Sequence, residues 1–72
     1  MKKEEAERAI VREWDIWART NIPEGKKPNG MDGVLFYGDL TQNRPELLSF
    51  RATGDKWQHV HSFLLRARRV SD

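Results

Sequence analysis

Residues 31–53 have the sequence MDGVLFYGDLTQNRPELLSFRAT, and two interpretations of this stretch lead to two different fold classes. In the first, residues 34–37 form a short apolar run that fits a strand, and residues 48–53 alternate apolar and polar side chains, as a half-buried strand does. A β-hairpin that turns at residues 43–45 would then lie between two helices. This interpretation predicts an α+β protein.

The second interpretation places two short helices in the same stretch. Phe36 and Leu40 keep helical spacing, and Asp32 can cap a helix that begins at the next residue. Pro45 suits the first position of a further helix, and no Asn-Gly or Asp-Gly turn separates the two candidate strands. We therefore favour an all-α fold, a small bundle of three to four helices with a helix-turn-helix-like C-terminal half. A hairpin at about residues 33–53 remains the alternative.

The N-terminal segment carries a stronger helical signal. Apolar residues from Ala6 to Trp17 recur three to four residues apart, which predicts an amphipathic helix over about residues 3–20. Charged residues fall on the opposite side, and Asp15 with Arg19 is one of the favourable pairs spaced four residues apart. Such pairs contribute only a few tenths of a kcal/mol, so the stability of this helix must come from burial of its apolar side.

A loop and a last helix complete the organisation of the chain. Residues 21–30 contain two prolines and two glycines, which predicts a loop. Asp55 is a good N-cap residue with Gln58 as its capping-box partner, and apolar residues follow at helical spacing. We therefore expect a helix over about residues 55–69.

Length and composition limit the classes of protein that remain. The chain has 72 residues and no cysteine, so we expect residues 1–72 to form one small domain without disulfides, Cys-based zinc sites or thiol nucleophiles. A reducing cytoplasm is the expected compartment. No apolar run approaches the roughly 18 residues of a membrane span, and acidic residues at the N-terminus do not suit a signal peptide. The formal charge is +2, and the positive excess lies in residues 51–72.

The last helix presents a polar face without acidic residues. Its side chains are of the types that hydrogen-bond to base edges and phosphates, and a short helix with a turn at residues 52–54 before it would approximate a helix-turn-helix. Lys26 and Lys27 of the loop could add a second basic contact. The pattern predicts a small cytoplasmic protein that binds nucleic acid such as DNA through Gln58, His59, Ser62, Arg66 and Arg69.

Surplus apolar residues support a different hypothesis. Ile16, Phe63 and Val70 fall at the edge of, or outside, the main apolar arcs of their helices. Apolar surface that the fold does not bury often marks an interface. The alternative function is therefore a protein-interaction module, which could be an adaptor, an inhibitor or a homodimer.

Two arrangements of polar residues resemble enzyme or metal sites, and neither is convincing. Asp55, His59 and Ser62 are spaced for an acid, imidazole and hydroxyl series on one face of a helix. An exposed helical face supplies neither an oxyanion hole nor a pocket that excludes water. His59 and His61 diverge on a helix and cannot bind one metal ion together. We therefore expect no enzymatic activity, no metal and no cofactor.

Overall fold

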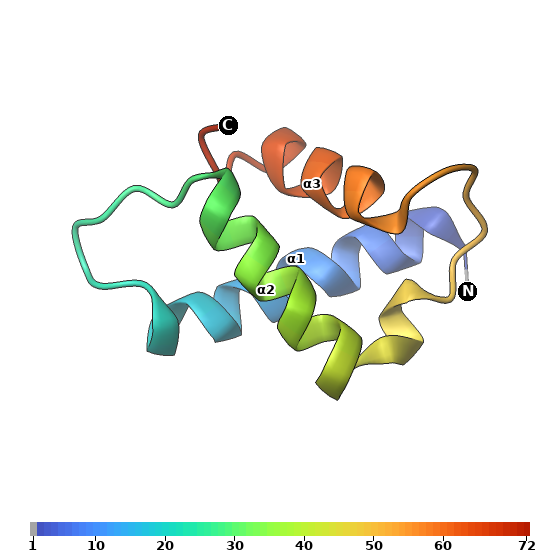
Figure 1. Ribbon diagram of the computed structural model, residues 1–72, viewed down its shortest axis with the longest axis horizontal. Coiled ribbons are helices and arrows are strands. Elements are labelled where there is room, and N and C mark those ends of the chain that lie inside the picture. The colour runs from blue at the N-terminus through green and yellow to red at the C-terminus, as the bar shows by residue number, and fades with distance from the viewer. Residues whose placement is uncertain (1) are drawn as a thin grey trace.

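The computed structural model describes residues 2–72, and every regular element in this range is helical. Figure 1 shows α1 (Lys3–Asn21), with α2 (Gly30–Asn43) crossing in front of it and α3 (Lys56–Arg66) lying along one side. A single turn of 3-10 helix, η1 (Pro45–Leu48), follows α2. The prediction of an all-α bundle is confirmed, and no hairpin forms within the described residues.

α1 matches the helix that its periodicity predicts. Ala6, Ile10 and Trp14 are spaced four residues apart and are all buried on one side of this helix. The Trp14 ring meets the Phe36 ring of α2 edge-on, with the ring centroids 5.2 Å apart. The apolar side of α1 therefore meets α2 through these aromatic rings and also packs against α3 and η1.

α2 begins earlier than the sequence predicts. Asn29 is its N-cap, and the Asn29 side-chain oxygen accepts hydrogen bonds from the amides of Met31 (3.0 Å) and Asp32 (3.2 Å). The Asn29 amide donates to the Asp32 carboxylate at 3.0 Å, which completes a capping box. The prediction that Asp32 caps a helix starting at residue 33 is wrong, because Asp32 is the third helical residue and supports the cap from inside the helix.

The segment after α2 differs from a helix-turn-helix. Pro45 occupies the start of η1, as predicted, but η1 is only one turn long and residues 49–55 separate it from α3. A helix-turn-helix has two helices joined by a turn of about three or four residues. The helix-turn-helix-like arrangement that we expected in the C-terminal half is therefore not formed.

The start of α3 agrees with the sequence prediction. The Asp55 carboxylate accepts a hydrogen bond from the Trp57 amide at 3.0 Å and so caps the helix. No side-chain bond from Gln58 completes a capping box within residues 2–72. Within residues 2–72, the side chain that caps α3 is therefore that of Asp55.

α3 ends at Arg66 and not near residue 69. The Arg68 amide bonds to the Leu65 carbonyl (3.0 Å), and the Arg69 amide bonds to the Leu64 carbonyl (2.8 Å). These two bonds form a Schellman motif, in which the residue after the C-cap adopts the left-handed conformation. Arg68 holds that position with φ of 59°.

The core includes two residues that the sequence interpretation placed on the surface. Phe63 is 1% exposed and Val70 is 6% exposed, so the expectation that they form an interface is wrong. The Phe63 ring packs against Phe50, with centroids 5.6 Å apart, because the segment before α3 covers a second side of that helix. Val70 follows the Schellman motif, where a helical wheel no longer describes the direction of side chains. The buried apolar residues are Ala6, Ile10, Trp14, Phe36, Leu40, Leu47, Phe50, Val60, Phe63, Leu64 and Val70.

Candidate functional site

Ion pairs to α1 hold both arginines that were expected to contact nucleic acid. Arg66 Nη1 lies 3.2 Å from Glu7 Oε1. Arg69 donates to both carboxylate oxygens of Asp15, at 2.8 and 3.3 Å. Asp15 therefore bonds to the C-terminal segment, where sequence spacing alone paired it with Arg19. Arg66 and Arg69 help to fix the C-terminal half of the protein on α1.

Other residues expected on the nucleic-acid face have different surroundings. Gln58 and Ser62 are exposed on α3. His59 is half-buried, with its Nε2 atom 2.7 Å from the Thr53 carbonyl oxygen and its ring edge-on to Phe50. The structure therefore leaves Gln58 and Ser62 available to a ligand and gives His59 a contact with the loop before α3.

The acid, imidazole and hydroxyl series is not assembled. Asp55 bonds to a backbone amide at the start of α3, and His59 bonds to the Thr53 carbonyl. No hydrogen bond joins Asp55, His59 and Ser62 within residues 2–72. The part of the chain that the structure describes also holds no group of three or more His, Asp or Glu side chains that could hold a metal ion.

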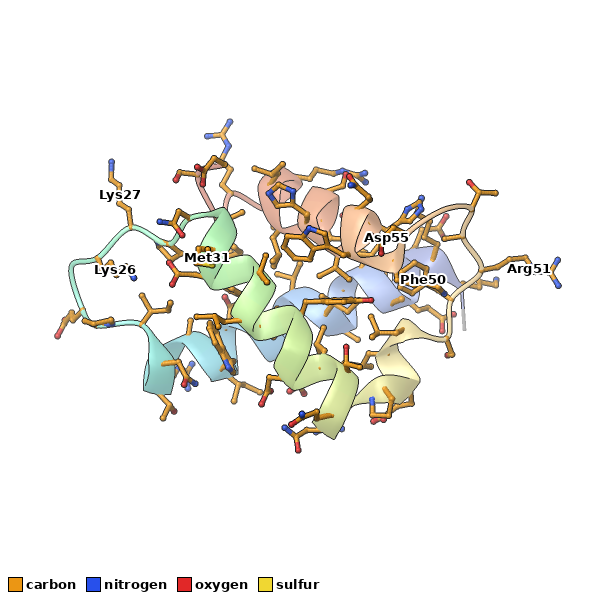
Figure 2. All side chains as sticks on the ribbon, in the orientation of Figure 1. Lys26, Lys27, Met31, Phe50, Arg51 and Asp55 are labelled. Atoms are coloured by element: carbon orange, nitrogen blue, oxygen red, sulfur yellow. The ribbon has the colours of Figure 1, made fainter. Side chains whose placement is uncertain are left out.

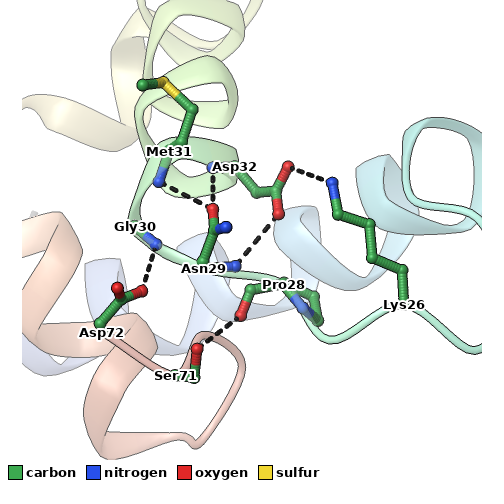
Figure 3. A network of polar contacts seen from close by, with 8 residues as sticks. All are labelled: Lys26, Pro28, Asn29, Gly30, Met31, Asp32, Ser71 and Asp72. Carbon is green, nitrogen blue, oxygen red and sulfur yellow. Dashed lines mark hydrogen bonds and ion pairs between the residues drawn. The ribbon is translucent and has the colours of Figure 1, made fainter.

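A network of polar contacts holds the loop between α1 and α2 from two sides (Figure 3). Lys26 Nζ lies 3.3 Å from the carboxylate of Asp32, which is itself buried. On the other side, Ser71 donates through its amide (3.0 Å) and its hydroxyl (3.2 Å) to the Pro28 carbonyl. The Gly30 amide donates to the Asp72 carboxylate at 2.7 Å. This network places the loop beside the C-terminal segment.

A surface pocket of about 410 Å³ lies where these two segments meet. Its apolar lining comes from Pro28, Leu65 and Val70, and its charged lining consists entirely of basic residues. The full lining is Lys27, Pro28, Leu65, Arg68, Arg69, Val70 and Ser71. The sequence interpretation included Lys27 and Arg69 but missed the pocket, because its walls come from segments about 40 residues apart.

The outward face of α2, which we define as Met31, Val34, Leu35 and Gly38, is a second feature that the sequence interpretation missed. Met31 is 67% exposed, Leu35 59% and Val34 46%, and a Cβ atom at Gly38 would meet nothing within 4 Å. These residues are three or four apart and so adjoin one another on the helix. Residues 31–38 contain several apolar side chains on both sides of α2, which was the available signal for an unburied face.

Ile16 is the expected interface residue that the structure leaves at the surface, with 53% of its area exposed. It lies on α1, apart in sequence from the outward face of α2.

No described helix is both long enough and apolar enough to span a bilayer.

Comparisons of this chain with protein-family models, curated proteins and solved structures find no match.

Proposed function

We propose that this protein is a non-enzymatic protein-interaction module that docks through the outward face of α2. The observation that carries the proposal is the exposure of three adjacent large apolar side chains, Met31, Val34 and Leu35. Contiguous exposed apolar surface marks interaction sites more often than isolated apolar residues do. This is the second of the two functions that the sequence predicts, with its contact residues moved from Ile16, Phe63 and Val70 to the outward face of α2.

Burial of these three side chains is too weak to hold a partner by itself, so other interactions must add to it. Full burial of one such side chain contributes roughly 1.5–3 kcal/mol, and about half of each is already buried by the fold. Docking would therefore gain about 1 kcal/mol from each of the three side chains before the costs of association are counted. A partner must therefore supply further contacts. Because the four residues of this face are uncharged, the partner surface that suits it is also apolar.

A second copy of the chain is the simplest partner of this kind. The four residues that define the outward face of α2 carry no charge, so pairing them with the same residues of a second copy across a two-fold axis brings no like charges together at the centre of the contact. Gly38, with open space around its Cα, allows a close approach of a second helix. Sedimentation equilibrium of the purified protein would then show a concentration-dependent dimer that Met31→Ser with Leu35→Ser abolishes.

Position-specific photo-crosslinking tests the docking surface whether the partner is a second copy or another protein. A benzophenone amino acid in place of Leu35 is expected to form a protein adduct of defined mass in cells that express the chain. The same group in place of Gln58, an exposed residue of α3, is the control and is expected to form none. Equal adducts from both positions, or none from Leu35, would contradict the proposal.

Nucleic-acid contact through α3 is the second candidate function. It is favoured by the absence of acidic residues from α3 and by the exposure of Gln58, Ser62 and Arg66 on it. Binding to duplex DNA at low salt should then weaken steeply as salt rises, since each phosphate contact releases counterions. A nucleic-acid adduct from the benzophenone at position 58, with none from position 35, would favour this function over the first.

A further inference from the structure

We propose that the pocket between the α1–α2 loop and the C-terminal segment binds an acidic peptide segment of a partner protein, with an apolar side chain in the pocket and carboxylates at its rim. This site lies on different residues from the outward face of α2. The two proposals can therefore fail independently of each other.

The charges of the pocket specify an anionic ligand. Among the residues that the structure describes, Lys27, Arg68 and Arg69 are the charged lining residues, and all three are basic. Arg69 is held by Asp15, whereas no ion pair joins Lys27 or Arg68 to a carboxylate within residues 2–72. Two basic side chains at the rim thus remain free to pair with a ligand.

The apolar lining favours a ligand that carries an apolar group as well as a negative charge. Pro28, Leu65 and Val70 line the space between the basic residues; because Val70 is almost fully buried, Pro28 and Leu65, which is 40% exposed, supply most of this apolar surface. Free phosphate or the sugar-phosphate backbone of DNA would leave this apolar surface in contact with water. A peptide in which Leu or a similar residue stands beside Glu or Asp satisfies both parts of the lining.

The left-handed backbone at Arg68 bears on why an arginine stands at the rim of this pocket. Its φ of 59° is left-handed, a conformation that glycine adopts without cost and that a residue with a Cβ adopts only with strain. The Schellman motif that ends α3 needs this conformation but makes no use of the arginine side chain. Stability alone would therefore favour glycine, and the side chain that replaces it stands at the rim of a basic pocket.

The test is an NMR titration of the full ¹⁵N-labelled chain with a blocked peptide that repeats Glu-Leu-Glu. We expect amide shift changes at residues 27 and 65–71, and no such changes with the matched peptide that has Gln in place of every Glu. If the Gln peptide produces the same changes, if the Glu peptide produces none, or if the changes lie on the outward face of α2, the proposal is wrong.

Arg68→Gly separates a ligand contact from a structural role. Glycine suits the left-handed conformation, so this variant should have an unchanged or higher Tm while it binds the peptide about twofold to fivefold more weakly. Lys27→Gln should weaken binding by a similar factor. Arg51→Gln is the matched control, since Arg51 is exposed and Figure 2 places it at the opposite end of the molecule from Lys27. Binding by the Arg68 variant at full strength would overturn the assignment.

A duplex DNA oligonucleotide added in the same titration distinguishes the source of the anion. Shift changes at the pocket with DNA but not with the acidic peptide would reject the peptide and assign the pocket to phosphate. Changes with the peptide alone would support the proposal.

Discussion

Two glycines of α2 provide a matched test of how tightly this helix packs against α3. Alanine in the interior of a helix is favoured over glycine by about 0.5–1 kcal/mol. A Cβ atom at Gly38 would meet nothing within 4 Å, whereas at Gly33 it would lie 3.0 Å from the Cη2 atom of Trp57. We therefore expect Gly38→Ala to stabilise the protein by about 0.5–1 kcal/mol when it is measured at concentrations at which the chain is monomeric, and Gly33→Ala to behave differently.

The expected cost at Gly33 depends on whether the Trp57 ring can move away. That ring stacks on His61 with the centroids 5.0 Å apart and packs against Tyr37 at 5.6 Å, so neighbours restrain it on other sides. Extra volume in such a site costs about 1–3 kcal/mol. This cost outweighs the helical gain, so Gly33→Ala should be less stable than Gly38→Ala by about 1–3 kcal/mol and less stable than the native chain by up to about 2 kcal/mol.

Thermal unfolding followed by circular dichroism resolves this difference, since 1 kcal/mol shifts Tm by about 4–8 °C in a domain of this size. A third comparison identifies the cause. With Trp57→Phe as the background, the shorter ring leaves room for the new methyl group, and Gly33→Ala should no longer be destabilising. If Gly33→Ala is as stable as Gly38→Ala in the native background, the close packing of α2 on Trp57 is refuted.

Three further expectations concern other parts of the fold. Phe63→Ala should lose about 3–5 kcal/mol in urea unfolding, because its ring is buried, whereas Ile16→Ser should lose only about 1 kcal/mol, because half of that side chain is already exposed; similar losses would contradict the assigned burial. Asn29→Ala should lower the free energy of unfolding by about 1 kcal/mol, because it removes the cap of α2. Asn29→Ser should keep most of that stability, since serine also caps helices, and a Ser variant as unstable as the Ala variant would argue against capping. A double-mutant cycle of Arg69→Ala and Asp15→Ala should give a coupling energy below about 1 kcal/mol, because both side chains are about 40–45% exposed. This coupling should fall in 1 M NaCl. Zero coupling at low salt would show that the pair does not form in solution.

Short-range signals were sufficient to predict most of the helices. The helix over residues 3–20, the proline at the start of η1 and the cap at Asp55 each depend on side chains within one or two turns of one another, and the structure confirms them. The choice between a hairpin and helices at residues 31–53 was also decided correctly by Pro45 and by the lack of a hairpin turn. The cap of α2 was predicted less well, because the sequence prediction named Asp32 alone, whereas Asn29 and Asp32 act together in a capping box.

The candidate sites depended on contacts between segments that are distant in the chain. Asp15 could pair with Arg19 on its own helix, but the fold brings Arg69 closer, across 54 residues of sequence. A helical wheel could not show that Val70 is buried, because the chain leaves the helix before that residue. Which apolar face of α2 stays exposed depends likewise on where α1 and α3 pack. Each helix carries its own pattern of apolar and polar residues, but only the packing of all the helices determines which surface is covered and which charges are neutralised.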